Sequence, residues 1–369
     1  MLTAFTNAAI FTGRGISQGQ ALLIEDGHIR ALTEIESLPA DTELIDCGGH
    51  YLAPGLLDLQ IYGAGGHLFS NHPTPEALEA VAEAIVLTGT TGFMLTLATN
   101  PMEIVYEAIR VAGEHPHPAL LGLHLEGPYI STAKRGAHPE AYVRRPERKE
   151  LETLLKAGRG IVKMMTIAPE CWEPELISLL TDYGVVVSAG HSNATFAEAM
   201  KGYAAGIRTT THLFNAMSPF HHRDTGLPGA AFRSGTAFAS IIADGIHVDY
   251  NALAVSKALL QDRLFLITDA VAETREGFYI HVRQKDRYTL PDGTLSGSAL
   301  TLLQAVSNCV EHAGIALPEA LRMATVYPAA VIGSADRGAL EPGCRADLIL
   351  FDRNMALSGV CFGGAFRRC

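Results

Sequence analysis

Four polar side chains each follow a short apolar run that is typical of a buried strand. They are Glu126, His191, His212 and Asp269, and the runs before them span 120–125, 184–190, 208–211 and 264–268. In a parallel barrel the active site is built at the carboxyl ends of the strands, so these side chains are expected to converge. Two histidines and one carboxylate suffice to hold a Zn²⁺-like ion while leaving one position open for water. The aspartate could then handle the proton, and the pattern predicts a metal-dependent hydrolase.

Each of these residues also has a structural explanation. A histidine beside glycine, such as His191, is more often structural than catalytic, and Glu126 in His-Leu-Glu-Gly-Pro could simply cap the next loop. The coincidence of four such residues at four strand ends favours a shared site. Loops after predicted strands hold further candidates, because binding residues concentrate there. These are His138, His221, His222 and His247, with Arg223 completing a cationic cluster suited to phosphate.

The elements that must position these residues alternate between strands and helices from Pro54 onwards. Helical stretches such as 174–183 and 250–260 separate the strand candidates. The strand candidates span 56–61, 92–98, 120–125, 162–167, 185–189, 209–213, 239–243 and 264–268. Eight strands are the number that closes a parallel barrel, so the chain is predicted to be an α/β protein with a (β/α)₈ TIM-type barrel. An open doubly wound sheet is the rival, but no Gly-x-Gly-x-x-Gly opens a helix after the first strand.

The two chain ends have a different sequence pattern, with short strand candidates in place of alternating strands and helices. Short strand candidates at 21–25 and 28–32 flank Asp26-Gly27, a pair that favours a tight hairpin turn. The tail returns to strand character at 346–351. We expect the tail to pair with the N-terminal strands in a small β domain.

Composition limits the classes of partner. The chain has 369 residues, 48% of them hydrophobic, and carries 28 Lys and Arg against 39 Asp and Glu, for a net charge of −11. This acidic balance argues against nucleic acid and anionic membranes as partners. The six cysteines form no C-x-x-C pair, which indicates free thiols in a reducing compartment. No signal peptide and no apolar run of about 18 residues is visible, so a soluble cytoplasmic protein is expected.

Several motifs together resemble one family. They are Pro-Gly-Leu-Leu-Asp-Leu-Gln at 54–60, His-Leu-Glu-Gly-Pro at 124–128, Ser-Ala-Gly-His-Ser at 188–192, Thr-His-Leu-Phe-Asn-Ala-Met at 211–217, Ala-Asp-Gly-Ile-His at 243–247, Thr-Asp-Ala at 268–270 and Leu-Ser-Gly-Ser at 295–298. In combination these motifs are specific, and over nearly its whole length the chain resembles the N-acetylglucosamine-6-phosphate deacetylases of the amidohydrolase superfamily. The resemblance implies metal-dependent hydrolysis of the acetamide of N-acetyl-D-glucosamine 6-phosphate, giving D-glucosamine 6-phosphate and acetate.

The resemblance also implies an organisation and roles for individual residues. It places 1–53 together with 333–369 in a small β-sandwich domain and 54–332 in the barrel. The metal ligands would be Glu126, His191 and His212, with Asp269 as general base and acid and His138 helping to polarise the carbonyl. Contacts to the sugar phosphate would come from Ala137, Asn215, Ala216, Arg223, His247, Leu295, Ser296 and Gly297. A homodimer is implied, because the family's equivalent of Arg223 reaches the neighbouring subunit's phosphate.

One position predicts the number of metal ions. Many amidohydrolases carry His-x-His on the first strand, where this chain has Gln60-Ile61-Tyr62. Glutamine is a poor ligand beside imidazole, so Gln60 marks a vestigial second-metal position and one divalent ion is expected. Zn²⁺ is the first choice, although a His₂Glu set also suits Fe²⁺, Co²⁺ or Mn²⁺.

The alternatives concern the substrate and the presence of catalysis. Many relatives have Asn where Tyr62 stands, and Val271–Thr274 also departs from the usual Thr-Ala-Pro-Ala, which leaves N-acetylgalactosamine 6-phosphate or another N-acetylated amino sugar open as substrate. A cyclic-amide hydrolase would usually keep His-x-His and a carboxylated lysine. A non-catalytic scaffold would usually have lost a ligand or the catalytic acid, and here all four are present.

Overall fold

The computed structural model describes residues 2–369 and forms two compact units. One unit comprises Met1–Asp58, Ile85–Gly92 and Leu302–Cys369, and the other comprises Leu59–Ala84 and Phe93–Thr301. The division of the chain at 54–332 stays a prediction.

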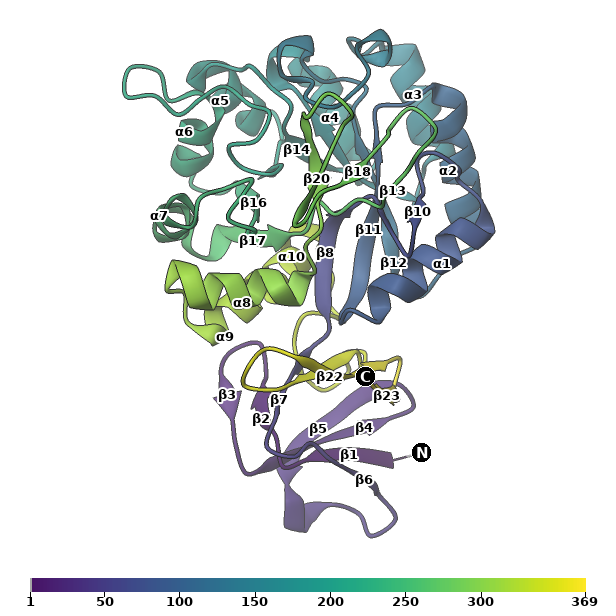
Figure 1. The fold of residues 1–369 in the computed structure, drawn as a ribbon, viewed down its shortest axis with the longest axis vertical. Coiled ribbons are helices and arrows are strands. Elements are labelled where there is room, and N and C mark those ends of the chain that lie inside the picture. The colour runs from purple at the N-terminus through teal and green to yellow at the C-terminus, as the bar shows by residue number, and fades with distance from the viewer. Residues whose placement is uncertain (1) are drawn as a thin grey trace. The chain divides into compact units, whose positions relative to one another are not determined.

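Eight strands form one sheet whose order follows the chain, β17-β16-β15-β14-β13-β12-β11-β8 (Figure 1). From β11 to β17 each strand pairs in parallel with the next. The ring closes where Tyr62 N donates to Ala270 O at 2.9 Å and Asp269 N donates to Gln60 O at 3.0 Å. The strands are β8 (Leu56–Ile61), β11 (Thr90–Ala98), β12 (Leu120–Glu126), β13 (Val162–Ile167), β14 (Val186–Ala189), β15 (Thr209–Thr210), β16 (Phe238–Ile242) and β17 (Leu264–Ile267). The predicted (β/α)₈ TIM-type barrel is confirmed.

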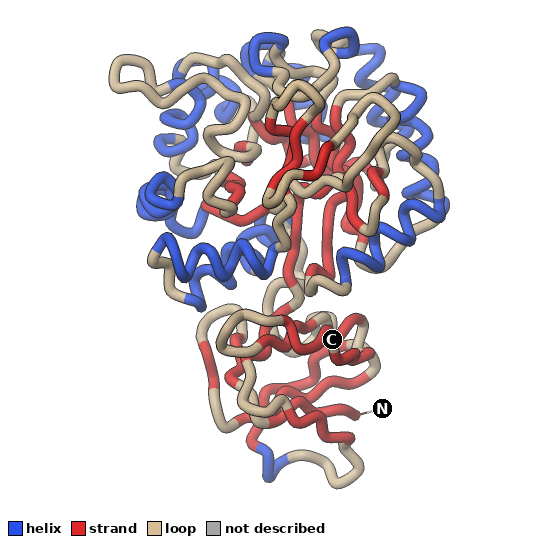
Figure 2. The backbone as a smooth tube through the Cα atoms, in the orientation of Figure 1, coloured by secondary structure: helices blue, strands red, loops and turns tan. Residues whose placement is uncertain are grey.

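Helices cover the outside of these strands, as Figure 2 shows by the blue segments around the red ones. Every residue of β8 and β11 is buried, as expected for strands covered on both faces. A capping box begins α5: Thr195 Oγ1 accepts from Glu198 N at 3.3 Å, and Thr195 N donates to Glu198 Oε2 at 2.8 Å. The helices are α1 (Pro75–Val86), α2 (Met102–Glu114), α3 (Arg148–Ala157), α4 (Pro174–Asp182), α5 (Phe196–Ala204), α6 (Gly226–Arg233) and α7 (Tyr250–Leu260). Within residues 2–369 no helix has the length and apolar character needed to cross a membrane.

Two small sheets extend the connections around the barrel. A two-stranded sheet joins β9 (Gly63–Ala64) to β10 (His67–Leu68) directly after β8. A three-stranded antiparallel sheet follows β17 and contains β18 (Val282–Arg283), β19 (Arg287–Thr289) and β20 (Leu295–Ser298). A bridge between Ala270 and Ser298 ties the end of this excursion back to the chain after β17. Short 3₁₀ turns lie at Ile35–Ser37, Thr132–Lys134, Glu140–Tyr142, Pro169–Cys171 and Gln261–Arg263.

The chain ends build two further sheets. The four-stranded sheet has the order β5-β4-β1-β6, and the six-stranded sheet has the order β23-β22-β21-β7-β2-β3. Asp26 and Gly27 turn the β4–β5 hairpin with φ of 47° and 78°, as the predicted tight turn requires. The strands are β1 (Leu2–Thr6), β2 (Ala9–Phe11), β3 (Ile16–Ser17), β4 (Gln20–Glu25), β5 (His28–Glu34), β6 (Glu43–Asp46), β7 (Tyr51–Pro54), β21 (Leu348–Phe351), β22 (Leu357–Phe362) and β23 (Ala365–Arg368).

One core joins these two sheets. Leu22 and Ile29 of the four-stranded sheet are buried in the same cluster as Leu52 and Leu348 of the six-stranded sheet. The tail pairs with the N-terminal region as predicted, because β21 runs antiparallel to β7 with Ile349 opposite Ala53. The β-sandwich from both chain ends is therefore confirmed. The same unit includes α8 (Leu302–Ala313), α9 (Leu317–Ala324) and α10 (Val326–Ile332).

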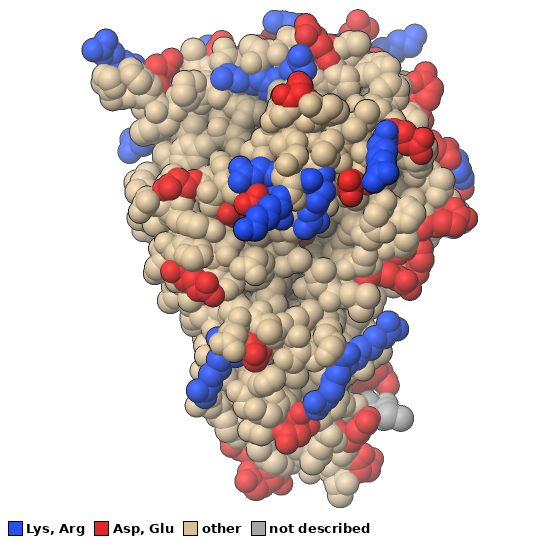
Figure 3. All heavy atoms as spheres, viewed as in Figure 1, with Lys and Arg blue, Asp and Glu red and all other residues tan. Residues whose placement is uncertain are grey.

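The surface carries both signs of charge. On the face drawn in Figure 3, acidic and basic side chains are interspersed rather than gathered into one large field of a single sign.

Candidate active site

The four strand-end residues predicted from the sequence lie in one cavity of about 410 Å³. Glu126 is the last residue of β12, and the other three each stand two residues after a strand, His191 after β14, His212 after β15 and Asp269 after β17. The predicted strand at 209–213 is shorter than expected, since β15 ends at Thr210 and leaves His212 in the following turn. The convergence itself follows from the barrel, whose parallel strands all end at one face.

Left-handed backbone conformations direct three of these side chains into the cavity. His191, His212 and Asp269 have φ of 45°, 33° and 55°, values that residues other than glycine rarely adopt. Each costs roughly 1–3 kcal/mol and persists only where surrounding contacts enforce it. Two such contacts are the bonds from His212 N to Ser240 Oγ at 2.8 Å and from Asp269 N to Gln60 O at 3.0 Å. The chain therefore turns sharply at the strand ends and presents these side chains to the cavity.

The donor atoms of Glu126, His191 and His212 form a compact triangle. Glu126 Oε1 lies 3.3 Å from His191 Nε2 and 3.1 Å from His212 Nε2, and the two Nε2 atoms are 3.1 Å apart. Tetrahedral ligands about 2.0–2.1 Å from a zinc ion would be separated by roughly 3.3 Å, close to these edges. His191 Nδ1 donates to Lys134 O at 2.9 Å, which leaves the Nε2 lone pair for a ligand. The residues present therefore fit a divalent metal ion.

Charge and burial set the protonation of this cluster. Glu126 is 1% exposed, and although burial raises its pKa, the neighbouring His191, His138 and His212 hold the pKa well below its usual range. Burial lowers the pKa of His212, but the hydrogen bond and charge of Glu126 raise it overall. Asp269 is partly exposed to the cavity, and desolvation there raises its pKa above that of an ordinary aspartate, as does the charge of Glu126. A carboxylate with a raised pKa is suited to exchange protons.

Gln60 stands between the two carboxylates. Its Nε2 donates to Glu126 Oε1 at 2.9 Å and to Asp269 Oδ1 at 2.9 Å. At the predicted vestigial second-metal position the chain thus has an amide nitrogen, which supplies hydrogens rather than lone pairs.

His138 is a neutral hydrogen-bond donor facing the cluster. Thr99 N donates to His138 Nδ1 at 3.2 Å, so the ring hydrogen is on Nε2, which lies 3.2 Å from Glu126 Oε2. Burial and the nearby His191 lower the pKa of His138 to about 4. The ring therefore stays neutral near pH 7 and keeps an Nε2–H to offer.

Most of the predicted substrate contacts line the same cavity, and one does not. His247 is held by Asp244, whose Oδ2 lies 2.6 Å from His247 Nδ1. Arg223 is exposed in a turn in which His221 N donates to Asp224 O at 3.0 Å, and it is not among the residues that line the cavity. The predicted residues that do line it are Ala137, Asn215, Ala216, His247, Leu295, Ser296 and Gly297.

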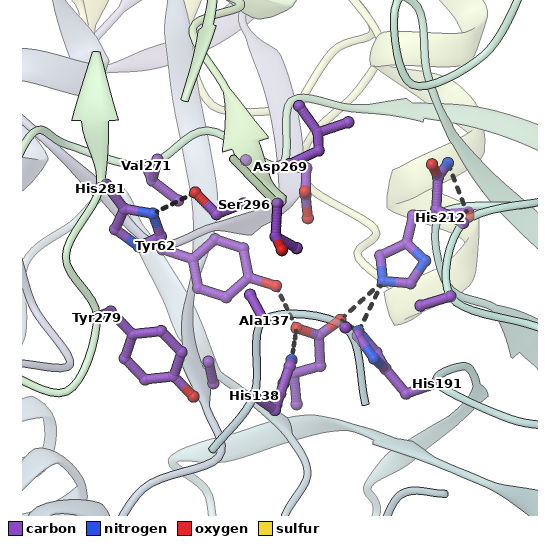
Figure 4. Close-up of a pocket in the computed structure, with 18 of the residues that line it drawn as sticks. Tyr62, Ala137, His138, His191, His212, Asp269, Val271, Tyr279, His281 and Ser296 are labelled. Carbon is purple, nitrogen blue, oxygen red and sulfur yellow. Dashed lines mark hydrogen bonds and ion pairs between the residues drawn. The ribbon is translucent and has the colours of Figure 1, made fainter. Parts of the chain in front are cut away.

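The sequence interpretation missed an aromatic side of the cavity. Figure 4 shows His191 and His212 on one side and Tyr62, Tyr279 and His281 on the other. Tyr279 and His281 stack with ring centroids 6.0 Å apart, and His281 Nδ1 lies 2.9 Å from Ser296 Oγ. Both belong to the excursion after β17, where no periodic pattern indicated a direction for the side chains. The one available signal was that Tyr62, just past the end of β8, lies two residues after Gln60, since residues two apart share a face of an extended chain.

Comparisons with known proteins found two matching family models and relatives that align over the full chain. The model of the amidohydrolase family matches residues 51–365, and that of the NagA composite domain matches residues 3–52. The chain is 34% identical to N-acetylglucosamine-6-phosphate deacetylase of Haemophilus influenzae, over 100% of both chains. It is 33% identical to N-acetylgalactosamine-6-phosphate deacetylase of Shewanella sp., over 97% of this chain and 94% of the relative. The crystal structure of N-acetylglucosamine-6-phosphate deacetylase from Pasteurella multocida superimposes with a TM-score of 0.96 at 34% identity, covering 100% of both chains.

Proposed function

This chain belongs to the amidohydrolase family, and from that premise we propose that it hydrolyses the acetamide of N-acetylglucosamine 6-phosphate to glucosamine 6-phosphate and acetate. The observation that carries this conclusion is the cavity in which Glu126, His191 and His212 meet Asp269. The full-length similarity to deacetylases of phosphorylated amino sugars supplies the substrate class. The predicted family and reaction agree with these findings.

We propose one divalent ion per chain, held by Glu126, His191 and His212. When bound, it would supply positive charge that polarises the acetyl oxygen and lowers the pKa of an attacking water. Zn²⁺ is the first choice for this His₂Glu set, with Fe²⁺, Co²⁺ and Mn²⁺ as alternatives to be decided by metal analysis.

The side chains supply the proton steps and the oxyanion contact. Asp269 takes a proton from water as the oxygen of that water bonds to the acetyl carbon. The Nε2–H of His138, which faces Glu126 Oε2 in this structure, would donate to the carbonyl oxygen once substrate is bound, a contact that strengthens as negative charge develops there. Asp269 then gives its proton to the amide nitrogen while the C–N bond breaks. The products are acetate and the free amine of the sugar phosphate.

His247 and the Asn215–Ala216 segment would bind the sugar phosphate, together with Arg223 of a neighbouring copy in a homodimer. Arg223 does not reach the cavity of its own chain, which supports a role across subunits. The six cysteines are free thiols, in keeping with the proposed cytoplasmic location.

Arg223→Ala should therefore raise KM for the phosphorylated substrate by roughly 10- to 100-fold, because a charge-assisted phosphate contact of about 1.5–3 kcal/mol is lost. The value of kcat should change little. Steady-state kinetics on the variant test this, with Arg353→Ala as a matched exposed arginine far along the chain. An unchanged KM would place the phosphate elsewhere.

The proposed reaction is tested by acetate release from a small panel. The panel contains N-acetylglucosamine 6-phosphate, its galactosamine and mannosamine isomers, and unphosphorylated N-acetylglucosamine, each with as-purified, chelated and zinc-restored protein. Chelator-sensitive turnover of the gluco isomer, with little on the free sugar, supports the proposal. Preference for the galactosamine isomer would favour the activity named for the Shewanella relative. No turnover of any member would overturn the assignment.

A further inference from the structure

Tyr62, labelled in Figure 4, is a buried tyrosine whose hydroxyl group lies against the carboxylate of Glu126. It follows β8 by one residue, is 7% exposed and lines the cavity. Its hydroxyl donates to Glu126 Oε2, since an ionised carboxylate can only accept. Gln60 Nε2 also lies 2.8 Å from this hydroxyl oxygen, but its two hydrogens face Glu126 Oε1 and Asp269 Oδ1, each at 2.9 Å.

The two oxygens of Glu126 consequently have different surroundings. Oε1 faces His191 Nε2 at 3.3 Å and His212 Nε2 at 3.1 Å, in the metal triangle. Oε2 is contacted instead by the Tyr62 hydroxyl and by His138 Nε2 at 3.2 Å. The carboxylate is therefore presented to the triangle through one oxygen only.

We propose that Tyr62 is a positioning residue that fixes Glu126 as a one-oxygen ligand and so raises the affinity of the site for a single divalent ion. This inference rests on the proposed metal-dependent function. A carboxylate without its outer partner rotates among several orientations, and binding must then select one of them. The Tyr62 O–H and Gln60 N–H groups also point at the carboxylates, so a second cation between them would meet hydrogens instead of lone pairs. The site therefore holds one ion.

If Tyr62 served only to pack the cavity wall, removing its hydroxyl should leave Zn²⁺ affinity unchanged. The ring belongs to a buried cluster with Leu68, Ala98 and Val271, and phenylalanine would preserve all of that packing. The hydrogen bond to Glu126 is made by the hydroxyl, which phenylalanine lacks. Tyr62→Phe therefore removes the proposed role and leaves the packing role intact.

The experiment measures Zn²⁺ affinity by competition with a chromophoric chelator, using metal-free preparations of three full-length chains. These are the wild type, Tyr62→Phe and Tyr279→Phe. The control removes a hydroxyl from the same cavity, because Tyr279 Oη donates to Thr99 O at 2.6 Å and not to a metal-site residue. We expect Tyr62→Phe to bind Zn²⁺ about 10- to 100-fold more weakly, the loss typical of removing an outer partner of a ligand. The control should bind as the wild type does.

Stoichiometry and kinetics complete the test. The wild type should take up one equivalent at excess Zn²⁺, and the variant should reach the same stoichiometry at higher Zn²⁺ and regain acetate release in parallel with the bound metal. Thermal unfolding of the metal-free chains verifies folding, and the stoichiometry of the wild type tests the single-ion site even if Tyr62→Phe does not fold. Equal Zn²⁺ affinity in wild type and variant, or two tightly held equivalents in the wild type, would overturn this inference alone. A wild type that binds no metal would overturn the proposed function as well.

Discussion

Asp269→Asn is expected to keep the metal ion and to lose roughly 10²- to 10⁴-fold in kcat for each proton transfer that the carboxylate performs. Asparagine has the same shape, and its Oδ1 can still accept the hydrogen bond that Gln60 Nε2 donates to Asp269 at 2.9 Å. The cavity should therefore stay intact. What the amide cannot do is take the proton of water and return it to the leaving nitrogen.

The measurement combines acetate release with metal analysis of the purified variant. Asp262→Asn serves as a matched control, since Asp262 is exposed in the 3₁₀ turn after α7. The wild type should also lose activity as the pH falls through the pKa of Asp269, because only the ionised carboxylate accepts a proton. Desolvation raises that pKa, so the loss should begin at a higher pH than for an ordinary aspartate. Near-normal turnover of Asp269→Asn would remove this residue from the mechanism.

The four residues that the sequence predicted to converge share a simple geometry. Glu126, His191, His212 and Asp269 end or follow strands, and the closure of a parallel barrel brings those ends together whatever the loops do. Element boundaries were less reliable. The strand predicted at 209–213 is only Thr209–Thr210 in the structure, because the backbone turns into a left-handed conformation at His212, with φ of 33°.

No comparable geometric rule predicted the aromatic side of the cavity, because most of its residues do not end or directly follow barrel strands. Tyr279 and His281 lie in an irregular excursion whose path depends on contacts distant in sequence, such as Tyr279 Oη to Thr99 O at 2.6 Å. The sequence also did not predict the hydrogen-bond partner of Tyr62, since Glu126 lies 64 residues further along the chain. Sequence periodicity indicates the face of a strand on which a side chain lies, but not the atom that it meets across a barrel.

His191→Ala should release metal and activity together. His191 supplies one of three ligand atoms, and its removal leaves Glu126 and His212, too few protein ligands for a catalytic zinc site. The loss of metal affinity should exceed the 10- to 100-fold that follows removal of an outer partner, so this variant should bind Zn²⁺ more weakly than Tyr62→Phe does. Turnover should fall to background at micromolar Zn²⁺.

Whether His191→Ala loses metal affinity or only thermal stability distinguishes a metal ligand from a structural histidine. Metal content by elemental analysis and acetate release are measured on the same preparation, with His312→Ala as an exposed control at the end of α8. Imidazole added to the buffer should restore part of both metal binding and turnover, because it can enter the space left by the side chain and offer the same nitrogen. A purely structural histidine would instead lower the unfolding temperature of the metal-free chain without changing Zn²⁺ affinity. A variant that keeps its metal and its turnover would exclude His191 from the ligand set and require a different third ligand beside Glu126 and His212.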